Sequence, residues 1–374
     1  MITSEPSPLH VTRGTCYALF AYEVGLSVDL DRCEAHITAL TERQRLRQRR
    51  RAPQYFDYRP RPLRVIQDTE ALSVGAHRTA ESVDLVVYDF GAVSVAYSIA
   101  LAGPFRDLIE LSDALYDNAV LRADSLRRVN QLLDTIRPAV VRAHVADWVE
   151  TYTIFQIEAF TTPCAPQELY TTHAETVAQI LRSEHAALSA DEIRDATVQH
   201  ISYAADDVTI IDWDATVLYD RNAEDVRAVL EFANAELLEM RYLDEQLDNA
   251  LDESYEALSR GAWGRLRIHG SSRADLHRVA QLQVDNALLF EGVNNALKLL
   301  GDQYLARVYR LVSERFHLAE WDASILRKLQ TIESIYEKMS DVASNRRMEV
   351  LEWIIIVLTV VSIAVYFIPG VAPH

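Results

Sequence analysis

The feature that most constrains the fold is the absence of helix-breaking residues from the C-terminal half of the chain. No proline occurs between Pro166 and Pro369, and no glycine occurs between Gly103 and Gly261. Since proline and glycine are the residues that most often end helices, stretches without them favour long helices. We therefore expect three long helices, over residues 223–259, over residues 273–313 and from Glu320 through Ile368.

Apolar residues in these expected helices recur at three- and four-residue steps. The first helix shows Leu230, Ala233, Leu237 and Met240, and the third shows Ile325, Leu329 and Ile332. This spacing is typical of coiled coils. The pattern predicts a helical coiled-coil region over residues 221–347, in which antiparallel helices pack together or form the seam of a homo-oligomer.

An acidic stripe runs along the first of these helices, at Asp244, Asp248, Asp252 and Glu256. Like charges four residues apart destabilise an isolated helix, so we expect cationic partners. A turn near residue 265 would bring Asp252 and Glu256 opposite two arginines of the second helix, Arg273 and Arg278. These four residues are the predicted register pairs; a solvated acidic face and a divalent-cation site are the alternatives.

The chain ends in an uncharged apolar run, residues 353–368. This run predicts a single transmembrane anchor over residues 348–369, followed by a short tail at 370–374. Arg346 and Arg347 precede the run, which places the N-terminal part in the cytoplasm under the positive-inside rule. The alternative is a helix buried in a soluble oligomer. The anchor residues are Trp353, Ile354, Ile355, Ile356, Val357, Leu358, Tyr366 and Phe367.

The N-terminal half mixes strand and helix patterns. After a disordered tail at 1–13, residues 14–220 predict one α+β domain or two half-sized units. Strands are expected at 15–22 and 148–160, in a hairpin around Gly91 and within 208–218, where β-branched and aromatic residues gather. Helices are expected at 29–47, 105–118, 121–136, 166–181 and 191–203. The fold class is therefore α+β: a mixed α/β domain, long antiparallel coiled-coil helices and one transmembrane helix.

Three segments carry a resemblance to a known family. They are LEWIIIVL (351–358), VLEFANAELLEMRYLDEQLD (229–248) and DLVVYDFGAVSV (84–95). Together they resemble the "required for meiotic nuclear division" family, which is shared by yeast, mitochondrial and bacterial proteins, over residues 80–368. The resemblance implies a membrane-anchored α+β protein without established catalytic residues, and a link to translation from its mitochondrial members.

An arginine-rich segment stands out in an acidic protein whose net charge is −18. That charge argues against a general nucleic-acid binder, because phosphate contacts need clustered cations. Residues 43–64 nevertheless carry nine arginines and one acid, Asp57. The segment predicts a contact with anionic lipid, RNA or the ribosome; a solvated helix end is the alternative. The contact residues would be Arg45, Arg47, Arg49, Arg50 and Arg51.

No motif for catalysis, cofactor binding or metal binding is visible. Cys16, Cys33 and Cys164 form no CxxC pair, which fits a reducing compartment. No two glycines are separated by a single residue, so a GxGxxG loop is excluded, and no lysine follows a glycine as in a P-loop. We expect a non-enzymatic, membrane-anchored scaffold or adaptor without cofactors; the alternative is an enzyme or small-ligand sensor with its site in the α+β domain.

Overall fold

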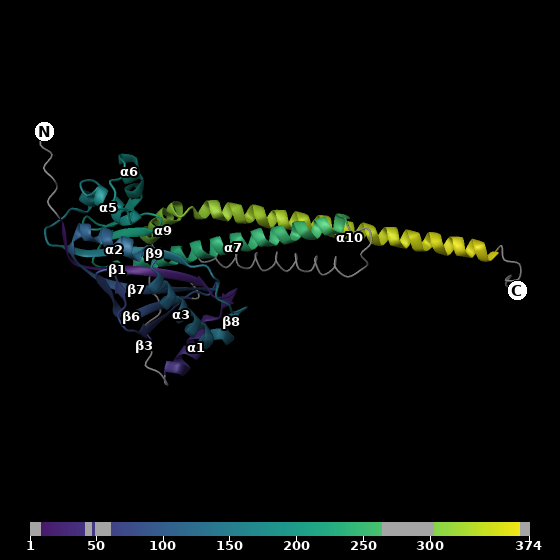
Figure 1. Ribbon diagram of the computed structural model, residues 1–374, viewed down its shortest axis with the longest axis horizontal. Helices are drawn as coiled ribbons and strands as arrows, with labels where there is room; N and C mark the ends of the chain where they lie inside the picture. Colours follow the sequence, from purple (N-terminus) through teal and green to yellow (C-terminus); the bar gives the residue numbers. More distant parts are fainter. Residues whose placement is uncertain (1–8, 42–46, 49–60, 264–302, 367–374) are drawn as a thin grey trace. The chain divides into compact units, whose positions relative to one another are not determined.

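The computed structural model describes residues 9–41, 47–48, 61–263 and 303–366 (Figure 1). The chain divides into two compact units. The first joins residues 1–243 to residues 289–323, and the second joins residues 244–288 to residues 324–374.

The first unit is built on one large sheet with strand order β10-β11-β12-β9-β1-β7-β6-β4-β3, in which β5 pairs with β6. Neighbouring strands are antiparallel except β9 and β12, which run parallel. A separate pair joins β2 (Ser27–Val28) to β8 (Val140–Val141). The strands of the large sheet are β1 (His10–Glu23), β3 (Arg47–Gln48), β4 (Leu63–Asp68), β5 (Ser73–Val74), β6 (His77–Val87), β7 (Ala92–Pro104), β9 (Glu150–Phe160), β10 (His200–Ile201), β11 (Val208–Ile211) and β12 (Ala215–Tyr219).

The central strand β1 is buried on both faces, which explains its nearly continuous apolar sequence. Successive side chains of a strand point to opposite faces. Phe20 and Tyr22 therefore lie in one hydrophobic core, while Leu19 and Ala21 lie in the other. Both cores need a layer of helices, because apolar faces of this size are stable only when covered.

Helices that follow one another early in the chain cover the first face. They contribute Leu30, Leu111, Leu133 and Ile180 to that core. The bounds are α1 (Leu30–Thr41), α2 (Leu108–Leu115), α3 (Ala119–Ile136), α4 (Pro166–Leu169), α5 (Ala174–Arg182) and α6 (Ala190–Val198), with short 3₁₀ turns at Phe105–Asp107 and Arg137–Ala139.

Two later helices cover the second face. They are α7 (Glu224–Trp263), through its part up to residue 243, and α9 (Gln303–Arg315). Leu230 and Leu238 of α7 join Val308 of α9 in the second core. The expected boundary at residue 220 is thus not a boundary of the folded unit, because the sheet needs these helices to bury its second face.

The α+β prediction is confirmed, and most expected elements are present. The hairpin around Gly91 forms between β6 and β7. Several expected bounds differ from the structure. β1 begins at His10, inside the predicted tail. The helix expected at 166–181 is divided into α4 and α5, and the helix expected at 191–203 ends at Val198, before β10. The helix expected at 29–47 is α1, which does not reach residue 47. Arg47 instead pairs with Ile66 as part of β3.

The second unit contains the rest of α7 and the main part of α10 (Leu318–Tyr366). The expectation of an unbroken helix from about residue 320 is confirmed within the described residues, because α10 is continuous over 49 residues. Leu247 of α7 and Ile325, Ile332 and Ile335 of α10 are buried. Residues 264–302 lie outside the described residues, so the antiparallel coiled coil stays a prediction.

The predicted membrane anchor and membrane location are wrong for the part of the chain that the structure describes. No helix there is both long and apolar enough to cross a bilayer. The physical reason is length: from Trp353 to its described end at Tyr366, the apolar part of α10 spans ~21 Å, against ~30 Å for the hydrocarbon core.

Candidate functional site

The most unusual feature of the first unit is a set of buried polar side chains on α7. Glu231, Asn234, Glu236 and Glu239 all lie on the part of α7 that covers the second core, and each is almost fully buried. Burying a carboxylate is unfavourable unless it is paired or neutralised. The partners of each carboxyl group therefore decide how its burial is offset.

Glu231 is neutralised by an ordinary set of partners. Ser94 of β7 donates a hydrogen bond to its Oε1 at 2.8 Å, and the Arg64 guanidinium of β4 lies 3.4 Å from its Oε2. Arg64 also faces Asp84 at 3.9 Å. This group ties α7 to β4 and β7.

Glu239 meets a second carboxyl group instead of a cation. The alternation along β1 places Glu23 on the same face as Leu19 and Ala21, so its side chain points toward α7. The two carboxyls hydrogen bond to each other, and the Gly25 amide donates to Glu23 Oε1 at 3.2 Å. Burial and, for Glu23, the adjacent Glu239 raise the pKa of both carboxyls.

Glu236 is a third buried carboxyl with a raised pKa. The Tyr309 hydroxyl of α9 donates a hydrogen bond to its Oε2 at 2.6 Å. Burial raises the pKa of Glu236 to about 8, an effect that the tyrosine bond opposes and Asp322 reinforces. Near neutral pH this side chain is thus largely a neutral acid that bridges α7 and α9.

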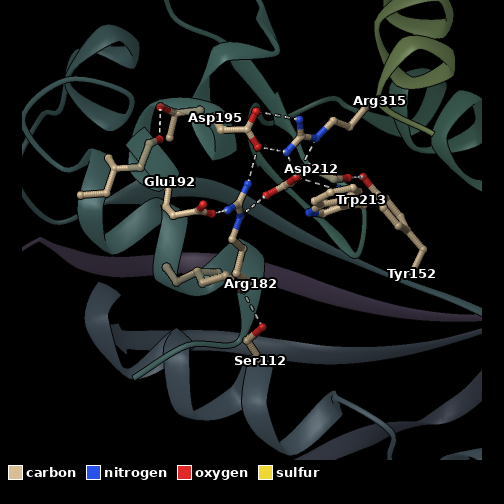
Figure 2. A network of polar contacts seen from close by, with 11 residues as sticks. Ser112, Tyr152, Arg182, Glu192, Asp195, Asp212, Trp213 and Arg315 are labelled. Carbon is tan, nitrogen blue, oxygen red and sulfur yellow. Dashed lines mark hydrogen bonds and ion pairs between the residues drawn. The ribbon is translucent and has the colours of Figure 1, made fainter. Parts of the chain in front are cut away.

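A second polar cluster surrounds Asp212, in the turn between β11 and β12 (Figure 2). Asp212 is fully buried. Arg182, at the end of α5, donates to it through Nε at 3.0 Å, and Arg315, at the end of α9, donates through Nε at 2.7 Å. Asp195 of α6 bridges the same two arginines, at 2.6 Å from Arg182 and 2.8 Å from Arg315.

The remaining contacts complete this cluster. Arg182 also pairs with Glu192, and the Arg315 guanidinium lies over the Trp213 ring at 4.8 Å (Figure 2). Tyr152 donates to the Asp212 carbonyl at 3.0 Å. The two arginines lower the pKa of Asp195 to about 2. Both arginines are engaged by acids, so the cluster joins α5, α6 and α9 to the edge of the sheet.

The structure leaves most predicted site residues untested. Among the predicted anchor residues, the side chains at 353–358 are exposed on α10, whereas Phe367 and the side chain of Tyr366 are outside the described part. Arg273, Arg278 and the predicted contact residues Arg45, Arg49, Arg50 and Arg51 lie outside it too, and of Arg47 only the backbone is described. Arg64, at the end of the arginine run, is described and is engaged by Glu231. The pairing of Asp252 and Glu256 with those arginines therefore stays a prediction.

Part of the acidic stripe has a partner that the sequence did not indicate. Lys328 of α10 lies 2.8 Å from Asp244 and 2.6 Å from Asp248. Asp248 is 60% exposed, so its ion pair contributes at most ~1 kcal/mol. These ion pairs join α7 to α10 in the second unit.

Sequence reasoning missed the buried carboxyls and Asp212. The segment VLEFANAELLEM (229–240) does carry a signal, because its charged residues interrupt a helix whose other faces are apolar. For Asp212 no such signal exists, since its two arginines come from distant helices. No group of three or more His, Cys, Asp or Glu side chains within the described ranges is arranged to hold a metal ion.

Comparison with known proteins gives a family without an assigned activity. The family described as "Uncharacterized protein MJ0711, N-terminal domain" matches residues 13–225. The curated protein of that name from Methanocaldococcus jannaschii is 22% identical over 233 residues, which cover 62% of this chain and 64% of the relative. The match thus spans less than two thirds of the relative's length. No solved structure matches the chain.

Proposed function

This chain belongs to the family of the MJ0711 N-terminal domain, and on that premise we propose that it is a non-enzymatic scaffold that assembles with copies of itself through α10. The α/β unit would be the part that the assembly presents to partners. The single observation that carries the proposal is the exposed apolar run on α10. Its side chains at residues 353–357 are between 49% and 67% exposed.

Geometry explains why one neighbour does not suffice to cover this run. Consecutive residues of an α-helix are ~100° apart, so five in a row face every direction. A helix that is apolar on all sides is normally buried. A symmetric bundle supplies neighbours on several sides and places the same run of each copy at the same level.

The test is the molar mass of the particles that the full chain forms in solution, measured by light scattering after size-exclusion chromatography. We expect the unaltered chain to be an oligomer and Ile355→Glu to shift it toward the monomer, because a buried charge in the bundle is unfavourable. Leu326→Glu is the matched control, since Leu326 is 40% exposed on the same helix outside the run. A monomeric unaltered chain at all concentrations would refute the proposal.

Two further predictions about partners remain hypotheses. The arginine run at 43–64 supports a contact with RNA, the ribosome or anionic lipid, and the family resemblance supports a link to translation. Binding of the full chain to a labelled RNA, measured across salt concentrations, tests the first. Binding that is equal in a variant with Arg49, Arg50 and Arg51 changed to glutamine would count against it.

One observation favours the alternative of a small-ligand sensor. The Asn234 side chain is 1% exposed, and neither its amide nitrogen nor its amide oxygen has a hydrogen-bond partner. Buried polar groups are normally paired. Native mass spectrometry tests this alternative, which requires a small molecule bound to the unaltered chain and lost in Asn234→Leu.

A further inference from the structure

The contact between Glu23 and Glu239 joins two elements that are far apart in the chain. Glu23 is the last residue of β1, and Glu239 lies on the part of α7 that covers the sheet. Their side chains are among the most buried polar groups of the first unit, with residue exposures of 1% and 2%. Apart from the contact between the two carboxyls, Glu23 Oε2 and Glu239 Oε1 have no hydrogen-bond partner.

A carboxyl pair of this kind is stable only while it holds a proton. A neutral acid donates a hydrogen bond to an adjacent carboxylate, whereas two ionised carboxylates at the same distance repel each other without solvent to screen them. The Gly25 amide stabilises one negative charge on Glu23. It does not compensate for two.

The charged groups around the pair are engaged elsewhere. Arg241, on the same helix as Glu239, lies 2.7 Å from Glu150 of β9 and over the Trp148 ring. In the segment beside the end of β1, His144 hydrogen bonds to Tyr242 through Nε2 at 2.9 Å.

Other titratable groups lie in the same layer between the sheet and its covering helices. In the turn after β6, burial raises the pKa of Tyr88 well above its ordinary value. On α7, Glu236 is bound to Tyr309 of α9. Arg64 faces Glu231.

We propose that Glu23 and Glu239 form a pH-sensitive latch, which holds α7 against the end of β1 while the pair shares a proton and releases α7 when both carboxyls are ionised. The latch operates within the first unit and is independent of oligomer assembly. The packing of α7 over the second core therefore depends on pH.

The sign of the effect follows from the raised pKa values. Burial raises the pKa of Glu239 from 4.5 to about 7, and that of Glu23 is also raised. Below pH ~4.5 the docked and released states are both protonated, so pH has no effect. As the pH rises from there through ~7, only the docked state keeps the proton. The equilibrium constant for docking α7 then falls by up to tenfold per pH unit for each proton that only the docked state holds.

The experiment is hydrogen–deuterium exchange of the full chain between pH 5 and pH 8.5, corrected for the intrinsic exchange rate. We expect the protection of amides at residues 229–240 to fall with rising pH. Glu239→Gln should remove most of this fall, because glutamine has the shape of the neutral acid and does not ionise. Glu23→Gln changes the other residue of the pair and should also remove most of the fall.

Two matched variants make the test decisive. Glu245→Gln is the same substitution at an exposed position of α7 and should behave like the unaltered chain. Glu236→Gln removes another buried acid of the helix, one that also has a raised pKa but is not part of the pair. If Glu236→Gln abolishes the dependence on pH while Glu239→Gln and Glu23→Gln leave it unchanged, the latch is refuted. Protection that is independent of pH in the unaltered chain would refute it as well.

Discussion

At the scale of single residues, Asp212 shows how one buried carboxylate organises several elements. It accepts hydrogen bonds from Arg182 and Arg315, whose side chains are only 14% and 10% exposed. The two cations would repel each other in the same space without it. Because Asp195, on the outer side, is 52% exposed, its ion pairs with the same arginines are weakened by solvent.

We therefore predict that Asp212→Asn destabilises the first unit by ~3–5 kcal/mol, the usual effect of removing one partner of a buried ion pair. The measurement is urea unfolding of the full chain near neutral pH. Asp191→Asn is the control: Asp191 pairs with Arg194 on the surface with its side chain 86% exposed, so its loss should change stability by less than ~1 kcal/mol. Equal effects of the two substitutions would show that the Asp212 cluster does not join the helices to the sheet.

At the scale of elements, the turn between β6 and β7 depends on a glycine. Gly91 has a φ of +108°, which side chains disfavour, and its carbonyl accepts a hydrogen bond from the Val24 amide at 2.8 Å. A Cβ atom at this position would lie 1.8 Å from the Gly25 carbonyl oxygen and 3.2 Å from Glu23 Oε1. The turn is thus packed directly against the loop that follows β1.

Gly91→Ala should lower the melting temperature more than Gly103→Ala does. Gly103 has a similar φ of +121°, but an added Cβ atom there meets nothing within 4 Å. Gly103→Ala therefore reports backbone strain alone, ~1–3 kcal/mol, whereas Gly91→Ala adds a backbone collision. Similar melting temperatures for the two variants would mean that the turn moves freely away from the loop.

At the scale of the whole molecule, the part that matches the family is smaller than the part that folds as a unit. The match ends at residue 225, whereas the second core also needs α7 and α9. Without these helices Leu19, Tyr152 and Leu218 would lose their cover. Exposed apolar surface on this scale favours aggregation.

A chain that ends at residue 225 should consequently bind a hydrophobic dye and lack a cooperative unfolding transition. A chain that ends at residue 323 keeps every residue of the first unit and should unfold cooperatively. The measurements are dye fluorescence and circular dichroism during thermal unfolding. Cooperative unfolding of the shorter chain would show that the sheet does not depend on its second layer.

Local pattern was enough to predict much of this fold. Two apolar runs around Gly91 identified the hairpin, and alternating aromatic and β-branched residues identified the strand at 148–160. The absence of helix breakers identified α7 and the unbroken α10. These features depend on residues that are close together in the sequence, so their pattern can be read from the sequence directly. The apolar run at 353–358 shows the limit of such reasoning: a pattern that demands cover does not say whether lipid or protein provides it.

Only the tertiary structure determined which side chains meet. The expected boundary at residue 220 separated the sheet from helices that complete its core, and nothing near Asp212 in the chain indicates Arg315. Glu23 looks like the solvated end of a strand, and Glu239 like an interruption in an apolar helix face. They become a proton-sharing pair because α7 packs against the face of β1 that carries Glu23, and the resulting burial raises the pKa of both carboxyls.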